Sequence, residues 1–356
     1  MNCFPGRLRY NSSIHCLLHA MPTSHLRFNQ LSDWLKVELD LEIEGIEPAS
    51  SDASFRRYYR VFLEHESRIV MDAPPPQEDV RPFVRVAGLM RDAGLQTPEI
   101  HAVDAERGFL LLGDLGSRSY LDALTTGTVD RLYADAAEAL VRLQQGVTVE
   151  SADLPRYDKP LLVRELGIFR EWLLEGALGL ALHANEERML DAVWEILVDS
   201  ALEQPTVCVH RDYHCRNLMV TDRLNPGILD FQDAVVGPIT YDLVSLLRDC
   251  YIAWPDDQVQ AWAEAFRQTL ERAGRNDVRD AARFRRWFDL MGMQRHLKAA
   301  GIFARLKIRD GKAGYLRDIP RTLGYVIEVG RAYPELHQFG EFIEQRVLPG
   351  VRGMMP

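Results

Sequence analysis

The hydrophobic positions divide the chain into a β-rich part followed by a helical part. After a first helical pattern in "LRFNQLSDWLKVEL", short runs of alternating or β-branched apolar residues fill residues 41–74. Polar turns separate these runs, which predicts three antiparallel strands. An amphipathic helix follows at 74–94, and "EIHAVD" and "GFLLLGDLG" add two more strands. We therefore expect a five-stranded antiparallel sheet with one helix packed on it.

Helical periodicity dominates after residue 116. β-type patterns return only in "PTVCVH", "NLMV" and "GILDF", and helices resume near Tyr241. This order predicts an α+β protein with two lobes. We expect a small β-rich lobe at 25–115 and a larger, mainly helical lobe at 116–356.

The charge balance and the cysteines limit the partners and the compartment. The chain has 52 acidic and 42 basic residues, a formal charge of −10, which argues against nucleic acid or an anionic membrane as partner. Five cysteines form no CxxC pair, and no stretch approaches the ~20 apolar residues of a membrane span. We expect a cytoplasmic protein with reduced thiols. Residues 1–24 show no periodicity, so we expect a disordered or upstream extension, with Met21 as an alternative start.

The candidate chemistry lies in "CVHRDYHCRNLMV", residues 208–220. His210, Asp212 and Asn217 stand as H-x-D-x4-N, and Asp230 of "LDF" follows thirteen residues after Asn217. A strand that ends in His-Arg-Asp presents a carboxylate, while the amide oxygen of Asn217 and the carboxylate of Asp230 suit Mg²⁺, which prefers hard oxygen ligands. The spacing therefore indicates phosphoryl transfer from a Mg²⁺-bound nucleotide.

The same stretch also permits two less specific interpretations. Cys208, His210, His214 and Cys215 have the ligand types of a zinc site. However, they lie on a strand and a loop rather than on one helix face, and neither cysteine has a CxxC partner. His210 is also compatible with a structural role, in which it hydrogen-bonds backbone in a tight turn, and we favour that role.

"HRDYHCRN", "LDF" and "GPITYDLVSLL" together resemble the aminoglycoside phosphotransferase and choline kinase family, over roughly residues 40–345. The resemblance implies a bilobal protein-kinase-like fold that uses ATP and Mg²⁺. It implies that Asp212 orients or deprotonates the acceptor hydroxyl and that Asn217 and Asp230 hold Mg²⁺. It also implies that Asp242 braces the catalytic loop.

The small lobe departs from that family. The third strand, "SRIVMDAP", has Met71 where a kinase of this fold has a lysine. The segment "SSDASFRRYYR" lies where a phosphate-covering loop belongs but lacks GxGxxG. It offers hydroxyl and guanidinium groups for phosphate from Ser51, Ser54, Arg56 and Arg57. A solvated hairpin with surface arginines is the alternative.

The strand "GFLLLGDLG" lies at the expected junction of the two lobes, where binding sites are common. We expect the backbone from Leu112 to Leu115 to pair with an adenine edge, with Asp114 as part of the nucleotide site. A plain core strand is the alternative interpretation.

Longer segments, including "GILDFQDAVVGPITYDLVSLLRDCYIAWP" and "QRHLKAAGIFARLKIRDGKAGYL", resemble the anomeric sugar kinases of cell-wall recycling. That resemblance implies phosphorylation of the C1 hydroxyl of N-acetylmuramate or N-acetylglucosamine. Asp233, Arg248 and Trp254 are candidate acceptor-binding residues, although Arg248 also suits an ion pair and Trp254 also suits packing. We interpret the helix that carries Arg295, His296 and Lys298 as scaffold first.

Two other functions remain open. Another small-molecule kinase of this fold would act on an aminoglycoside, an amino alcohol or a different sugar. A non-catalytic ATP-binding module would explain the missing lysine on the third strand. The presence of Asp212, Asn217 and Asp230 together favours an enzyme.

Overall fold

The computed structural model describes residues 22–51 and 55–355, and the chain divides into two compact units. The expectations for residues 1–21, including Met21, lie outside the described residues, as does Ser54. Residues 22–24, which we also assigned to a disordered or upstream extension, instead begin the first helix, so that boundary was wrong. The first unit comprises the chain up to Val80 together with Ile100–Asp114, and the second comprises Arg81–Glu99 together with Leu115–Pro356. In the described residues, no helix is long and apolar enough to cross a membrane.

The first unit is built on a five-stranded antiparallel sheet, as the alternating apolar pattern predicts. Neighbouring strands follow the order β1-β2-β3-β5-β4. The strands are β1 (Gly45–Ser51), β2 (Arg57–Phe62), β3 (Ser67–Asp72), β4 (Ile100–Asp104) and β5 (Phe109–Gly113). Met71 of β3 is buried and lies between Tyr58 of β2 and Leu110 of β5. The predicted sheet is therefore confirmed, and its third strand carries no lysine at Met71.

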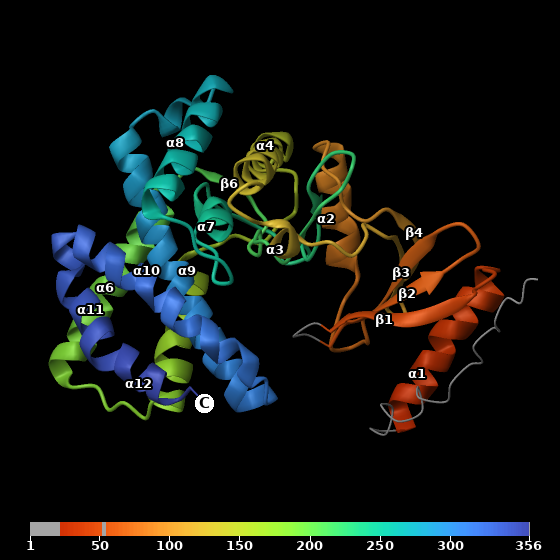
Figure 1. The fold of residues 1–356 in the computed structure, drawn as a ribbon, viewed down its shortest axis with the longest axis horizontal. Coiled ribbons are helices and arrows are strands. Elements are labelled where there is room, and N and C mark those ends of the chain that lie inside the picture. Colours follow the sequence, from red (N-terminus) through yellow and green to blue (C-terminus); the bar gives the residue numbers. More distant parts are fainter. Residues whose placement is uncertain (1–21, 52–54, 356) are drawn as a thin grey trace, which may run out of the picture. The chain divides into compact units, whose positions relative to one another are not determined.

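One face of this sheet packs on helix α1 (Pro22–Asp33) and the π-helical turn η2 (Trp34–Glu38) that continues it, as Figure 1 shows. The shared core contains apolar side chains from the helix, the turn and the strands. They are Leu31, Trp34, Leu35, Val61, Val70, Phe109 and Leu111. The helix that covers the sheet within this unit is therefore the first one in the chain.

Helix α2 (Arg81–Asp92) belongs with the second unit, whereas the sequence led us to expect it on the sheet. The ring of Phe83 on its apolar face lies 4.6 Å from that of Phe231. Arg85 on its polar face pairs with Asp153 at 2.7 Å. The amphipathic pattern predicted the helix correctly but could not show which partner buries its apolar face.

The second unit is mainly helical and has two short antiparallel strand pairs. The pairs are β6 (Thr206–Val209) with β9 (Val235–Pro238), and β7 (Leu218–Met219) with β8 (Gly227–Ile228). The helical elements after α2 are α3 (Tyr120–Ala123), α4 (Val129–Gly146), α5 (Lys159–Ile168), η3 (Phe169–Ala177), α6 (Ala184–Leu202), α7 (Tyr241–Leu247), α8 (Asp256–Arg272), η4 (Asn276–Val278), α9 (Ala281–Asp310), η5 (Ala313–Asp318), α10 (Ile319–Ala332), η6 (Pro334–Leu336), α11 (His337–Phe342), η7 (Ile343–Val347) and α12 (Leu348–Gly353).

Helix α9 is the centre of this unit and packs against α5, α6, α7, α10 and η3. Its start is fixed by Asp280, whose side chain accepts a hydrogen bond from the Arg283 N–H at 3.0 Å. It ends at Gly311, which adopts a left-handed conformation with φ 68°. Polar side chains that α9 buries, such as Asp289, Gln294 and His296, must therefore find partners inside the unit.

Candidate active site

The segments that follow β6 and β8 both turn sharply. Arg211 has φ 79° and Asp230 has φ 61°, both in the left-handed region that costs energy for residues with a side chain. Asp242, fully buried in the first turn of α7, accepts the backbone N–H of His210 at 2.6 Å and that of Arg211 at 2.9 Å. Burial raises the pKa of Asp242 to about 7, against the effect of these two donors. One buried carboxyl group thus holds the turn before Asp212.

His210 connects this turn to the strand that precedes Asp230. Its Nε2 lies 3.0 Å from the carbonyl oxygen of Leu229, and its Nδ1 accepts the Asp212 N–H at 3.2 Å. Burial lowers the pKa of His210 to about 4, so the ring is neutral and donates through one nitrogen while it accepts through the other. The position of His210 is that of a loop brace.

The structure brings Asp212, Asn217 and Asp230 together. The Asn217 Nδ2 donates to the carbonyl oxygen of Asp212 at 3.0 Å and approaches Asp230 Oδ2 at 3.4 Å. Asp230 Oδ1 accepts a hydrogen bond from Gln232 at 2.8 Å. The amide oxygen of Asn217 and the carboxylate of Asp230 are hard oxygen donors, so this pair fits the chemistry of Mg²⁺.

A buried charge network lies beneath Asp212, and it is the main feature that sequence reasoning missed. Glu165 of α5 pairs with Lys298 of α9 at 2.8 Å and with Arg211 at 2.5 Å. Tyr157 donates a hydrogen bond to the same carboxylate. Burial raises the pKa of Glu165, but the two cations lower it by more. The available signal was a glutamate within the apolar segment "LLVRELGIF".

The cations of this network act on Asp212, which is half-buried. Burial raises the pKa of Asp212, but electrostatic interactions, of which that with Lys298 is the largest, outweigh that effect, so the pKa lies below its usual value. Arg295 also donates to the carbonyl oxygen of Arg211 at 3.3 Å. Asp212 is therefore ionised and able to accept a proton.

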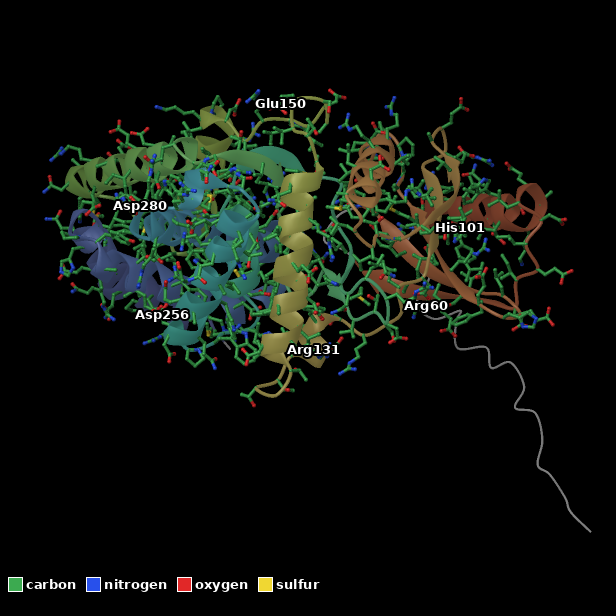
Figure 2. The ribbon with its side chains drawn as sticks, turned by 90° about the horizontal axis from the view of Figure 1, so that it is seen from above. Arg60, His101, Arg131, Glu150, Asp256 and Asp280 are labelled. Atoms are coloured by element: carbon green, nitrogen blue, oxygen red, sulfur yellow. The ribbon has the colours of Figure 1, made fainter. Side chains whose placement is uncertain are left out.

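The proposed acceptor residues do not form one group. Arg248 pairs with Asp289 at 2.8 Å and lies 3.4 Å from Asp256, the first residue of α8 (Figure 2). Trp254 donates to the hydroxyl of Tyr133 at 3.0 Å. Both residues line a cavity of about 270 Å³ whose wall does not include Asp233, which is exposed. The other residues that line it are Ala253, Asp256, Val259, Arg321, Gly324, Tyr325 and Glu328.

In the first unit, Asp114 is engaged within the protein. Its carboxylate accepts hydrogen bonds from the Nε of Arg60 on β2 (Figure 2) at 2.6 Å and from the hydroxyl of Ser67 at 2.7 Å. Leu112 lies between Ile69 of β3 and Ile100 of β4. A strand therefore lies on each side of Leu112, and the adenine contact expected over residues 112–115 stays a prediction.

The predicted phosphate-contacting arginines differ in their surroundings. Arg56 lies 3.9 Å from Glu78, and Arg57 is an exposed residue that opens β2 opposite Ser51. An exposed arginine such as Arg57 carries little structural information by itself. The geometry therefore leaves the nucleotide site as a prediction.

The zinc interpretation finds no support. In the ranges that the structure describes, no three His, Cys, Asp or Glu side chains are grouped so as to hold a metal ion. Cys208 and Cys215 are free and buried. Burial raises the pKa of the Cys208 thiol to about 12, as expected for a cysteine that packs in the core.

Comparison with known proteins agrees with this chemistry. The profile of the phosphotransferase enzyme family matches residues 45–287. An N-acetylmuramate/N-acetylglucosamine kinase of Pseudomonas putida is 45% identical over 91% of this chain and 98% of its own length. A protein of the same name from Pseudomonas aeruginosa is 47% identical over 89% of this chain and 96% of its own length.

Solved structures with lower sequence identity share the fold. A choline kinase from Streptococcus pneumoniae superposes with a TM-score of 0.59 at 13% identity, covering 84% of this chain and 98% of its own. The GDP complex of aminoglycoside 2′-phosphotransferase-IIIa also gives 0.59, at 16% identity over 83% of this chain and 98% of its own. At such identities the likeness concerns the fold alone.

Proposed function

We propose, because the chain belongs to the phosphotransferase enzyme family, that it is an ATP-dependent kinase of amino sugars. Its acceptors in this proposal are N-acetylmuramate and N-acetylglucosamine, and the phosphoryl group goes to the C1 hydroxyl. Support comes from the two Pseudomonas kinases, which match about nine-tenths of the chain. We also propose that it acts in the cytoplasm as part of peptidoglycan recycling.

The observation that carries this proposal is the grouping of an ionised Asp212 with Asn217 and Asp230. Asp212 accepts the proton of the acceptor hydroxyl as the phosphoryl group arrives. An anomeric hydroxyl is more acidic than an ordinary alcohol, so a carboxylate is a sufficient base. Asn217 and Asp230 would hold Mg²⁺, which neutralises charge on the nucleotide phosphates.

The remaining assignments belong to the same proposal. Asp242 and His210 fix the backbone on which Asp212 stands. Asp233, Arg248 and Trp254 stay candidates for acceptor binding, although Arg248 is already ion-paired with Asp289. Candidates for nucleotide binding are Ser51, Ser54, Arg56, Arg57, Leu112 and Asp114, of which Leu112 and Asp114 are the weakest, for the reasons given above.

A substrate panel tests the function. The protein would be supplied with Mg²⁺-ATP and with N-acetylmuramate, N-acetylglucosamine, kanamycin, choline or ethanolamine, and ADP release would be measured. We expect turnover with the two amino sugars and an acid-labile phosphate on C1. Phosphate on another hydroxyl, or choline or kanamycin as the best acceptor, would overturn the proposal.

Replacing the proposed base tests the role of Asp212. We expect Asp212→Asn to lower kcat by about 10²- to 10⁴-fold, because a positioned base contributes that much. ADP affinity, measured by calorimetric titration, should not change. Asp222→Asn is the matched control, since Asp222 is exposed on a neighbouring turn. Near-normal turnover in Asp212→Asn would remove Asp212 from the mechanism.

A further inference from the structure

Arg216 is a cation on the catalytic loop to which the function above gives no role. It lies between Cys215 and Asn217. Its guanidinium carbon is 3.8 Å from the centre of the Tyr251 ring and 5.8 Å from that of Tyr315. With the residues that the structure describes, the guanidinium makes no hydrogen bond or ion pair. Five N–H donors are thus held against aromatic rings without an acceptor.

The position of Arg216 is fixed by its neighbours. Asp249 accepts the backbone N–H of Cys215 at 2.9 Å through one oxygen and that of Tyr251 at 2.9 Å through the other. One carboxylate therefore ties the catalytic loop to the segment that carries the stacking ring. Tyr315 in turn stacks on Phe303, with ring centres 5.6 Å apart. An arginine held in this way loses little conformational freedom when it binds a ligand.

Other cations around Asp212 already have acceptors. Arg211 and Lys298 share Glu165, and Arg295 donates to a backbone carbonyl oxygen. Asp318, a buried acid, interacts electrostatically with Arg216. Its carboxylate, however, already forms an ion pair with Arg321, at 3.4 Å. Arg216 differs from these cations, because its guanidinium has no acceptor among the described residues and is therefore able to bind an anion.

The protein as a whole does not favour anionic ligands. Its formal charge is −10, so a negatively charged acceptor needs a local positive charge. His214, two residues before Arg216, lies edge-on to the same Tyr251 ring at 5.3 Å. Its Nδ1 is buried without a hydrogen-bond partner in the described part of the chain. Two hydrogen-bonding groups without a protein partner, the guanidinium of Arg216 and Nδ1 of His214, therefore lie near the Tyr251 ring in the described part of the chain.

We propose that Arg216 binds the carboxylate of an acidic amino-sugar acceptor and so determines specificity for N-acetylmuramate. N-acetylmuramate carries a carboxylate on its lactyl group, whereas N-acetylglucosamine has a plain hydroxyl at that position. The planar guanidinium matches a carboxylate through two parallel hydrogen bonds. This inference rests on the proposed amino-sugar kinase activity.

The test compares the two sugars in one variant. We expect Arg216→Met to lower kcat/KM for N-acetylmuramate roughly 10- to 100-fold, the effect of losing a hydrogen-bonded charge pair. For N-acetylglucosamine the loss should stay within about threefold. Arg216→Lys should restore part of the preference, because it keeps the charge without the fork. Arg317→Met is the matched control, since Arg317 is exposed on η5 close to Tyr315.

The methyl ester of N-acetylmuramate provides a second readout. Acid and ester are compared in the same protein sample, so a smaller folded fraction of the variant does not change their ratio. Wild-type protein should discriminate against the ester, and Arg216→Met should treat acid and ester alike. Equal losses for both sugars, or the same discrimination against the ester in both proteins, would overturn the role of Arg216. If wild-type protein phosphorylates neither sugar, the proposed function itself fails, and the inference fails with it.

Discussion

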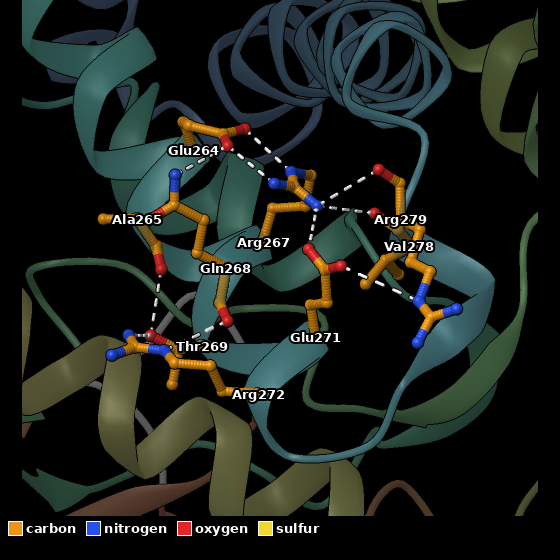
Figure 3. Close-up of polar contacts among 9 residues, drawn as sticks. All are labelled: Glu264, Ala265, Arg267, Gln268, Thr269, Glu271, Arg272, Val278 and Arg279. Atoms are coloured by element: carbon orange, nitrogen blue, oxygen red, sulfur yellow. Dashed lines mark hydrogen bonds and ion pairs between the residues drawn. The ribbon is translucent and has the colours of Figure 1, made fainter.

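Two arginine–glutamate clusters in the second unit have similar partners but very different surroundings. In the first, Glu165 is shared by Lys298 and Arg211 beneath the catalytic loop. In the second, Arg267 of α8 is shared by Glu264 and Glu271, with its Nη2 2.7 Å from Glu264 and its Nη1 2.8 Å from Glu271 (Figure 3). The first is one acid between two cations, and the second is one cation between two acids.

Burial separates these clusters. The Glu165 side chain is 4% exposed, whereas those of Glu264 and Glu271 are 41% and 36% exposed. Arg267 also donates to the carbonyl oxygen of Val278 at 3.1 Å, which joins α8 to the following turn. The Arg267 cluster, called the surface cluster below because both of its acids are partly exposed, therefore links the C-terminal part of α8 to the turn that follows it. The cations of the buried cluster lower the pKa of Asp212, the proposed base, so the number of ion pairs in a cluster does not reveal its role.

The largest effect on the free energy of unfolding should come from replacing Glu165, the acid that Lys298 and Arg211 share. Glu165→Gln removes the buried counter-charge that Lys298 and Arg211 share, and because their side chains are only 14% and 20% exposed, breaking these pairs should cost about 3–5 kcal/mol. We expect that loss in the free energy of unfolding, measured with urea. A loss below about 1 kcal/mol would mean that the Glu165 cluster behaves as an exposed one.

The second prediction concerns pH. Because the pKa of Asp212 lies below its usual value, its carboxylate stays ionised as the pH falls, and activity that needs it is lost only below that depressed pKa. Lys298 is the first of the cations that depress it. Lys298→Met should therefore raise this pKa and move the acid limb of the kcat/KM profile to higher pH.

The control for this experiment is Lys298→Arg, which retains the positive charge. Protonation of ATP as the pH falls affects wild-type protein and both variants equally. The ratio of variant to wild-type kcat/KM therefore reports only the titration of groups in the protein. We expect this ratio to fall as the pH is lowered in Lys298→Met and to stay level in Lys298→Arg. A level ratio in both variants would show that Lys298 does not set the pKa of Asp212.

Local patterns were enough to predict the sheet and the grouping of Asp212, Asn217 and Asp230. The strands at Arg57–Phe62 and Ser67–Asp72 follow from alternation, which depends on near neighbours in the chain. Asp212 and Asn217 lie five residues apart on one loop, so their spacing alone indicates a shared site. β9 (Val235–Pro238) was not predicted, because all four of its residues are buried and no polar position reveals a period of two.

Partners that lie far apart in the sequence could not be predicted. Glu165 and Lys298 are 133 positions apart, and nothing in either helical pattern specifies that they pair. For the same reason the sequence did not indicate that Arg60 and Ser67 donate hydrogen bonds to Asp114, which we predicted for nucleotide binding. The ion-pair role that we also considered for Arg248 could likewise not be given a partner, and the structure shows Asp289.

The smallest effect should come from the surface cluster. Glu264→Gln removes one partner of Arg267 but leaves Glu271 and two backbone carbonyl oxygens in place. Because Glu264 is also well solvated, we expect it to lower the free energy of unfolding by less than about 1 kcal/mol. The kcat/KM for either sugar should not change. A loss as large as that of Glu165→Gln would show that exposure does not decide the energetics of these two clusters, since both substitutions remove the same single charge.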